Sequence, residues 1–496
     1  MKIEFAAPTQ PESGALVLGV FEDAALTPSA EELDTRLDGT LRRAIGASRF
    51  SGKARQFLDV LAPAGAGADR VVLVGLGKPA ALDQRAAEDL GGAIYGHLAG
   101  SGAKRAAVAL DPVEGAPLAV AEIAARLAFG SRLASYRFDL YRTKQKPEDR
   151  PSLERLTVTL DGHAAAKKAF AGLDKVSEGV FLARDLVSEP PNVLYPATFA
   201  DRAKELSKLG VEIDVLSEKD MRKLGMGALL GVGAGSQHDS FVVVMQWNGG
   251  KKGRPPVAFI GKGVTFDTGG ISIKPAAGME DMKWDMGGAA AVVGLMKALA
   301  GRKAKVNAVG VIGLAENMPS GTAQRPGDVV TSMSGQTIEV INTDAEGRLI
   351  LADVLWYTQD RFKPEAMIDL ATLTGAIIIA LGHHNAGLFA SDDALAERLI
   401  ASGRAAGETV WRMPMDEAYD KQIASDIADM KNVGGRDGGS VSAAQFLKRF
   451  CNDVPWAHLD IAGVAWGSKA KPTVPKGGTG FGVRLLDRFV ADHYEQ

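Results

Sequence analysis

The segment Asn342-Thr343-Asp344-Ala345-Glu346-Gly347-Arg348-Leu349 places two carboxylates two residues apart, with an arginine two residues further on. The apolar run 337–341 before it is typical of a buried strand, and the run 349–356 after it is typical of a helix. The acids are therefore expected at the carboxyl end of a strand, where open α/β sheets bind ligands. They repel each other unless a cation or a proton lies between them, and the arginine suits a planar anion. The segment predicts a metal site beside an anion pocket.

A second polar segment, Gly261-Lys262-Gly263-Val264-Thr265-Phe266-Asp267-Thr268-Gly269-Gly270, follows the apolar run 257–260. Its glycines allow the backbone to turn sharply and a ligand to approach closely. Lys274 and Asp285 come shortly afterwards. The two segments together would bring four carboxylates to one site, which is too much negative charge for one divalent ion and appropriate for two. Two cations held by oxygen ligands indicate hydrolysis by a metal-activated water.

Each of these residues also has a possible role without a ligand. Asp267 can form a turn with the Thr-Gly-Gly that follows it, and Asp285 can cap a helix that begins at residue 287. The two lysines can be solvated surface cations, and Arg348 can pair with the nearby glutamate. Beside two cations, however, a lysine can lose its proton and become a ligand, or keep its charge and polarise a carbonyl.

The polar segments resemble the signature segments of the leucyl aminopeptidases, the two-metal cytosolic aminopeptidases. The resemblance extends from about Asp185 to the end of the chain, whereas the amino-terminal third is similar only in layout. After Gly235-Ser236 the family often has a Pro-Arg pair, but this chain has Gln237-His238-Asp239-Ser240, which includes none of the matched ligands. The matching stretches are 261–275, 281–288, 342–349, 369–376, 428–432, 456–463 and 478–485.

The resemblance implies which residues carry the chemistry. Two divalent ions per subunit, Mn²⁺ or Zn²⁺, would be held by Lys262, Asp267, Asp285, Asp344 and Glu346. Lys274 would stabilise the oxyanion, and Arg348 would hold a bicarbonate ion that serves as the general base. The pocket for the terminal side chain would be formed by Met282, Asn342, Thr372, Gly375 and Ala462.

The expected activity is the hydrolytic release of amino-terminal residues from peptides. A pocket of methionine and small residues with few charges suits leucine or another apolar side chain. The resemblance also implies a homohexamer, arranged as a dimer of trimers. Two alternatives remain: some bacterial family members also bind DNA, and a chain can keep the fold as a silent scaffold. The formal net charge of −3 does not support nucleic acid as the main partner.

The bulk composition is that of a soluble globular protein, with 46% hydrophobic and 24% charged residues. The single cysteine, Cys451, excludes an internal disulfide. The first residues, Met1-Lys2-Ile3-Glu4-Phe5, lack the apolar core of a secretory signal, and no apolar run reaches the roughly 18 residues of a membrane helix. We therefore expect a cytoplasmic protein that does not bind membranes.

Alternating strand and helix patterns predict two three-layer α/β domains. We expect a smaller amino-terminal domain over residues 1–160, a connecting helix over 161–190 that ends at Pro190-Pro191, and a larger catalytic domain over 191–496 with a mixed, mostly parallel sheet. The expected strands are 2–6, 15–21, 71–75, 106–110, 156–160, 211–216, 241–246, 257–260, 306–312, 339–341, 366–370 and 458–461. The expected helices include 84–97, 118–133, 200–209, 289–299, 349–358, 393–403 and 442–451.

Overall fold

The chain folds into two compact α/β units in the computed structural model, which describes residues 1–9, 11 and 13–495. The smaller unit comprises Met1–Ser177 and Lys469–Pro475, and the larger comprises Glu178–Ser468 and Lys476–Gln496. Helix α5 (His163–Ser188) continues from the first unit into the second. These observations confirm the predicted fold class, a smaller amino-terminal and a larger carboxyl-terminal α/β unit.

The smaller unit is built on a six-stranded sheet with the order β1-β6-β5-β2-β4-β3. All neighbouring strands are parallel except the edge pair β3 and β4. The strands are β1 (Lys2–Ala6), β2 (Ala15–Phe21), β3 (Phe57–Leu61), β4 (Arg70–Gly77), β5 (Arg105–Ala109) and β6 (Arg155–Thr159). The helices are α1 (Pro28–Arg36), α2 (Thr40–Gly46), α3 (Gln84–Ala99) and α4 (Val120–Ala134), with short 3₁₀ turns η1 (Glu22–Ala24), η2 (Pro79–Ala81) and η3 (Pro147–Asp149).

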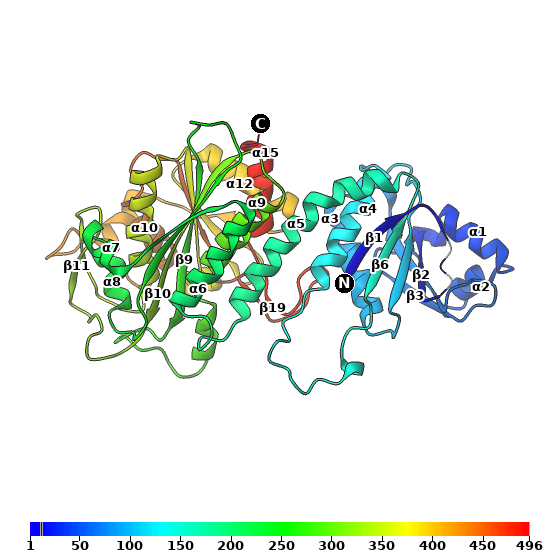
Figure 1. Ribbon diagram of the computed structural model, residues 1–496, viewed down its shortest axis with the longest axis horizontal. Coiled ribbons are helices and arrows are strands. Elements are labelled where there is room, and N and C mark those ends of the chain that lie inside the picture. Colours follow the sequence, from blue (N-terminus) through cyan, green and yellow to red (C-terminus); the bar gives the residue numbers. More distant parts are fainter. Residues whose placement is uncertain (10, 12, 496) are drawn as a thin grey trace. The chain divides into compact units, whose positions relative to one another are not determined.

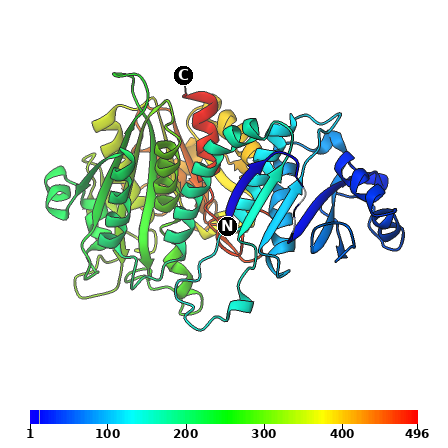
Figure 2. The ribbon, with the colours of Figure 1, turned by 45° about the vertical axis from the view of Figure 1, so that its right-hand side comes forward.

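Apolar side chains of α1 and α2 pack on one face of this sheet, where Leu33 and Leu41 share a core cluster with Leu16 and Leu73. Figure 2 shows these two helices together at one side of the smaller sheet. Strand β3 was not predicted from the sequence. It is an edge strand with mostly half-buried side chains, so the alternation of apolar and polar residues that identifies a strand is weak there.

The larger unit is built on an eight-stranded sheet with the order β15-β14-β17-β13-β9-β10-β8-β7. Its strands are β7 (Glu212–Leu216), β8 (Phe241–Asn248), β9 (Val257–Asp267), β10 (Asn307–Asn317), β13 (Ala366–Ala371), β14 (Ala386–Ala390), β15 (Val410–Arg412) and β17 (Trp456–Asp460). Two small sheets contain β11 (Val329–Thr331), β12 (Thr337–Glu339) and β16 (Met430–Lys431), and β18 (Trp466–Gly467) and β19 (Gly477–Gly478). The centre of the large sheet, from β17 to β10, is parallel.

Helices cover both faces of the large sheet (Figure 1). Helices α6 and α9 pack on one face, and α8, α10 and α14 contribute to the apolar core on the other. The helices of this unit are α6 (Pro196–Lys204), α7 (Glu218–Leu224), α8 (Gly227–Gly233), α9 (Gly287–Gly301), α10 (Gly347–Phe362), α11 (Gly375–Leu381), α12 (Asp393–Ala406), α13 (Glu417–Asp420), α14 (Gly439–Lys448) and α15 (Val483–His493), with 3₁₀ turns η4 (Glu205–Leu209), η5 (Met279–Trp284) and η6 (Lys421–Ile423). In the described part of the chain, no helix combines the length and apolar character needed to cross a bilayer.

The bounds of two expected strands were wrong. The strand expected over 257–260 continues through the glycine-rich stretch as far as Asp267, and the sharp turn allowed by the glycines follows at Gly269 and Gly270, where φ is 88° and 66°. The strand before Asn342 is shorter than expected and belongs to the small sheet of β11, β12 and β16. The carboxyl ends of β9 and β10 in the large sheet therefore provide the edge to which the acids are brought.

The close approach of α9 to the sheet depends on glycine. A Cβ on Gly288 would lie 1.9 Å from the carbonyl oxygen of Leu370 on β13, and a Cβ on Gly261 would lie 2.6 Å from the Cα of Ala289. A side chain at either position would push the helix away from β9 and β13. These glycines therefore determine the depth at which α9, and the segment just before it, lies on the sheet.

We expect Gly288→Ala to destabilise the protein by about 3 kcal/mol or more, because neither backbone can yield without unpacking the core. Thermal unfolding followed by circular dichroism measures the change. Gly96→Ala is the matched control, since Gly96 is an exposed residue inside α3 with no atom within 4 Å of the added Cβ. The control should keep or raise the midpoint, because alanine favours a helix interior. Equal midpoints for the two variants would contradict the packing described here.

Candidate metal centre

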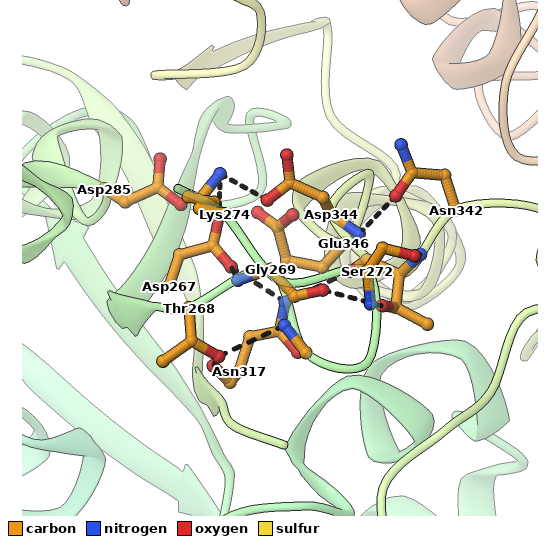
Figure 3. Close-up of polar contacts among 12 residues, drawn as sticks. Asp267, Thr268, Gly269, Ser272, Lys274, Asp285, Asn317, Asn342, Asp344 and Glu346 are labelled. Atoms are coloured by element: carbon orange, nitrogen blue, oxygen red, sulfur yellow. Dashed lines mark hydrogen bonds and ion pairs between the residues drawn. The ribbon is translucent and has the colours of Figure 1, made fainter. Parts of the chain in front are cut away.

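Three carboxylates converge at the carboxyl end of β9. Asp267 is the last residue of that strand, and Asp344 and Glu346 lie on the segment that leads into α10. One carboxylate oxygen from each of the three lies within 4.8 Å of the others. Figure 3 shows these side chains directed toward one another, together with Asp285 and Lys274. The tertiary structure therefore joins the two polar segments that the sequence analysis singled out.

Lys262 connects this group to the fourth carboxylate. Its Nζ lies 2.8 Å from Oδ1 of Asp285 and 2.8 Å from Oε1 of Glu346, and it donates to the carbonyl of Thr372 at 2.9 Å. The Lys262 side chain is only 3% exposed. The alternative that this lysine is a solvated surface cation is therefore wrong.

Lys274 bridges the remaining pair of acids. Its Nζ lies 2.9 Å from Oδ2 of Asp267 and also forms an ion pair with Asp344. The side chain is 20% exposed, so it is more accessible than Lys262. Each of the four carboxylates thus contacts one of two ammonium groups, and the group as a whole retains an excess of negative charge if all six side chains are ionised.

Burial and mutual repulsion perturb the site's proton affinities. Burial, followed by the charge of Glu346, raises the pKa of Asp267 to about 6 against the opposing effect of the two lysines. Burial alone would lower the pKa of Lys262, but the carboxylates of Asp285, Glu346 and Asp267 outweigh it and raise that pKa. Added positive charge would reduce the repulsion among the acids, because it favours their ionised form.

The donor set fits divalent cations. Oδ2 of Asp285 and Oε2 of Glu346 are buried, and neither has a hydrogen-bond partner among the residues that the structure describes. Buried carboxylate oxygens without partners are costly, and oxygen-rich clusters of this kind are typical of sites for divalent metal ions. Lys262 could join such a site as a ligand only after losing the proton that it now shares with the acids.

A polar side chain of β10 and polar residues of the loops themselves hold the ligand-bearing loops together (Figure 3). The Nδ2 group of Asn317, the last residue of β10, donates to Asp267 at 2.8 Å and to the carbonyl of Thr343 at 3.1 Å. Thr343 donates from Oγ1 to the carbonyl of Gly269 at 2.6 Å, and it exchanges two further hydrogen bonds with Ser272. These bonds fix the spacing between Asp267 and the segment that carries Asp344 and Glu346.

The structure gives different answers for the helix-capping role of Asp285 and the turn-forming role of Asp267. Asp285 does not cap α9: the N-cap residue is Met286, and Oδ1 of Asp285 instead accepts hydrogen bonds from Lys262 and from Oγ1 of Thr372 at 2.8 Å. Asp267 does serve the turn, because its Oδ1 accepts from the amide of Gly269 at 2.9 Å. Its second oxygen still faces Lys274.

Arg348 is buried at the first turn of α10. It forms no ion pair with Glu346 in the described structure, so the alternative of a structural Arg–Glu pair is wrong; its Nη1 donates instead to the carbonyl of Asn432 at 2.8 Å. Burial lowers the pKa of Arg348 to about 10, opposed by the charges of Glu346 and Asp460. Its Nε is buried and has no partner among the described residues, so a donor remains for an anion.

Three of the five predicted pocket residues, Thr372, Asn342 and Ala462, form hydrogen bonds to acidic residues at or beside this site. Thr372 contacts Asp285, and Oδ1 of Asn342 accepts from the amide of Asp344 at 2.8 Å. Gly375 follows Thr374 at the start of α11; Thr374 and Ala462 both donate to Asp460. Met282 lies half-buried on η5, three residues before Asp285.

Asn432 is an important site residue that the sequence analysis did not single out, although it ends the matched stretch 428–432. It is fully buried, accepts from the amide of Ile341 at 2.8 Å and donates to the carbonyl of Asn342 at 2.7 Å. With its carbonyl bonded to Arg348, it fixes both ends of the segment that contains the two acids. No local pattern identifies it, because its partners lie about 90 residues away.

Comparisons with known proteins agree with this geometry. Residues 181–487 match the catalytic domain of the cytosol aminopeptidase family, and residues 17–145 match the amino-terminal domain of the same family. The chain therefore belongs to the cytosol aminopeptidase family and is a metal-dependent aminopeptidase.

Relatives cover the whole chain. A probable cytosol aminopeptidase of Caulobacter vibrioides is 57% identical over 100% of both chains, and one of Nitrobacter winogradskyi is 56% identical over 100% of this chain and 99% of the relative. A solved mutant of tomato leucine aminopeptidase is 36% identical with a TM-score of 0.87, covering 99% of this chain and 97% of that one. The bottromycin maturation enzyme BotP in complex with Mn is 34% identical with a TM-score of 0.84, covering 97% and 99%.

We expect Asn432→Ala to weaken the binding of Mn²⁺ by about 10- to 100-fold, as is usual when a residue that orients metal ligands is lost. Isothermal titration calorimetry measures the affinity. Asn248→Ala is the matched control, because Asn248 is an exposed asparagine at the end of β8 whose side chain donates to Glu212. An Asn432→Ala protein that binds Mn²⁺ as tightly as the control would show that the segment 341–348 keeps its conformation without the hydrogen bonds of the Asn432 side chain.

Proposed function

We propose that this aminopeptidase works with two divalent cations and releases apolar amino-terminal residues from peptides. The observation that carries the proposal is the meeting of four carboxylates and two lysines at the carboxyl end of β9. If Lys262 loses its proton to become a ligand, the four carboxylates and the ammonium group of Lys274 carry a net charge of −3. One divalent cation would neutralise that charge only in part, whereas two would offset it in full. Bound divalent cations supply a water of lowered pKa and polarise the scissile carbonyl.

The ligands divide into two sets in this proposal. Asp267 and Glu346 lie centrally and would serve both cations, and Lys262 and Asp285 would complete the more tightly held one. Asp344 would complete the more exchangeable one. The side chains of Lys262 and Glu346 are each 3% exposed, whereas that of Asp344 is 32% exposed, which supports this difference in exchange. The free amine of the substrate would occupy one cation, which limits cleavage to the terminal residue.

Lys274 and Arg348 are the proposed catalytic residues. Burial tends to lower the pKa of Lys274, but Asp267, Glu346 and Asp344 outweigh it and raise that pKa, so the side chain stays charged and can stabilise a developing oxyanion. Arg348 would hold a bicarbonate ion as the general base. The unpartnered Nε of Arg348 supports this role, because guanidinium donors match a planar carboxylate-like anion.

The resemblance to the leucyl aminopeptidases also supports a homohexamer of the dimer-of-trimers type and a cytoplasmic location. Val329, Ile341 and Ile427 are exposed by 46%, 42% and 67% around the small sheet of β11, β12 and β16. Neighbouring subunits would cover such an apolar surface. Light scattering at micromolar concentration measures the assembly, and a monomer mass would contradict it.

Metal removal provides the first test. Protein stripped of metal should not hydrolyse leucine p-nitroanilide, and activity should return with Mn²⁺ or Zn²⁺, because the cations supply the activated water. The amino-terminally acetylated substrate should remain uncleaved under all conditions, since its amine cannot bind a cation. Activity in the stripped protein, or cleavage of the acetylated substrate, would overturn the proposal.

Substrate preference tests the pocket. Peptides that begin with leucine or methionine should be cleaved at least tenfold faster, by kcat/KM, than peptides that begin with aspartate. The reason is that Met282, Thr372 and Ala462 offer an apolar guest contact but give a carboxylate no cation of its own. Competition between Leu- and Asp-dipeptides, followed by chromatography, measures the ratio. A ratio near one would remove the assigned specificity.

A further inference from the structure

A buried charged cluster lies on β13 and β17, in the same sheet as β9. Asp369, His458 and Asp460 are all 0% exposed. Asp369 lies directly opposite His458 in the parallel register of the two strands. Because residues alternate between the faces of a strand, His458 and Asp460 share the face of Trp456. That face packs in the same core as α10, whose first turn carries Arg348.

Asp369 holds His458 in one orientation. Its Oδ1 lies 2.6 Å from Nδ1 of His458, and its Oδ2 accepts from Nε1 of Trp456 at 2.7 Å. An ionised carboxylate only accepts hydrogen bonds, so Nδ1 of His458 carries a hydrogen. The other ring nitrogen, Nε2, is therefore directed away from Asp369.

Asp460 adds a second buried negative charge beside this imidazole. It accepts from Oγ1 of Thr374 at 2.6 Å and from the amides of Leu373 and Ala462 at 3.1 and 3.2 Å. It thereby holds the segments of the proposed side-chain pocket. Two carboxylates removed from water on one face require compensating positive charge, and the guanidinium of Arg348, which interacts with Asp460, contributes to it.

Not every polar atom of this cluster has a hydrogen-bond partner among the described residues. Nε2 of His458 and Nε of Arg348 are both buried, and neither has a hydrogen-bond partner in the described part of the chain. The two groups lie close enough for the charge of Arg348 to act on the imidazole of His458. Burial alone would lower the pKa of His458, the carboxylates of Asp369 and Asp460 raise it, and Arg348 lowers it; the net shift is upward. With Nδ1–H directed at Asp369, Nε2 accepts a hydrogen bond when the ring is neutral and donates one when it is protonated. Two buried nitrogen atoms without partners indicate a shared polar partner.

We propose that His458 is a positioning residue for the anion held by Arg348: anchored on Asp369 through Nδ1, it presents a second buried nitrogen, Nε2, to the anion bound at Nε–H of the guanidinium. The inference rests on the proposed function, in which Arg348 holds bicarbonate. Bicarbonate has acceptor oxygens for Nε–H and an O–H group that Nε2 can accept, so it can satisfy both nitrogens, directly or through one water. The imidazole would then fix the anion relative to the metal centre.

Two substitutions at this position separate the proposal from a purely structural role. His458→Asn retains a donor near Nδ1 for Asp369 but has no atom near Nε2, so the bond to Asp369 is kept and the contact of Nε2 with the anion is lost. His458→Phe removes both and leaves Asp369 without its histidine, which should lower the midpoint of thermal unfolding. His97→Gln is the matched control, because His97 donates or accepts at 2.7 Å with Asp59 in the smaller unit.

The experiment uses full-length, Mn²⁺-loaded protein and sodium bicarbonate, with sodium chloride at equal ionic strength as the reference. The primary readout is the rise in thermal midpoint caused by bicarbonate, since a ligand that binds the folded state stabilises it. Mn²⁺ affinity, and kcat and KM for leucine p-nitroanilide, are measured on the same samples. For His458→Asn we expect an unchanged Mn²⁺ affinity, a KM within about twofold of wild type, a kcat lowered at least tenfold, and a half-maximal bicarbonate concentration raised at least tenfold.

A wild-type kcat and bicarbonate response in His458→Asn would overturn the proposal, as would a wild-type protein that shows no bicarbonate shift. A defect in His458→Phe alone would assign His458 a structural role and would also overturn it. Failure of the proposed function looks different: the wild-type protein would cleave no peptide with any metal, while the bicarbonate shift and its loss in His458→Asn would still be measurable.

Discussion

Repulsion among four carboxylates in a site that excludes most water is the constraint on which the rest of this structure depends. Asp267, Asp285, Asp344 and Glu346 come from three separate segments and would not assemble without compensation. In the folded chain the ammonium groups of Lys262 and Lys274 lie between them. Because the compensation is incomplete, two buried carboxylate oxygens remain free in the described structure. The same excess of negative charge that opposes folding favours the binding of divalent cations at this site.

The scaffold overcomes this repulsion by fixing the backbones that carry the acids. Parallel strands β9 and β10 end side by side, so Asn317 can reach Asp267 and the carbonyl of Thr343. Gly288 allows α9 to lie directly on β13, which places Asp285, two residues before the helix, next to Lys262. Each of these contacts is short-ranged and rigid. A cluster of like charges therefore has no freedom to relax by moving apart, and its geometry is set before any ligand arrives.

A second group of buried charged residues supports the carboxylates of the metal centre. Asp369 lies on β13, the strand next to β9, and His458 and Asp460 lie on β17, one strand further along the sheet. Asp460 accepts hydrogen bonds from Leu373, Thr374 and Ala462, in the segments of the proposed side-chain pocket. Arg348 connects the two groups, because the charges of Glu346 in the metal centre and of Asp460 on β17 both act on its guanidinium. In the proposed function, specificity, anion binding and metal binding would thus be connected through one arginine at the start of α10. Such a connection explains why so many polar groups are kept in the core despite the cost of removing them from water.

Local order in the sequence was enough to predict the α/β class, most strands and helices, and the clustering of the acids, because strand–turn–helix periodicity and clustered carboxylates are short-range patterns. The role of Lys262 followed only from the family resemblance, since an isolated lysine is usually a surface residue. Local order was not enough to show that β9 runs through its glycines to Asp267, or that the strand before Asn342 joins a separate small sheet. Nor could it identify Asn317, Asn432 or the Asp369–His458 pair, whose hydrogen bonds join residues 26 to 91 positions apart. Only the folded chain decides those pairings, since they depend on strand order and register and not on spacing.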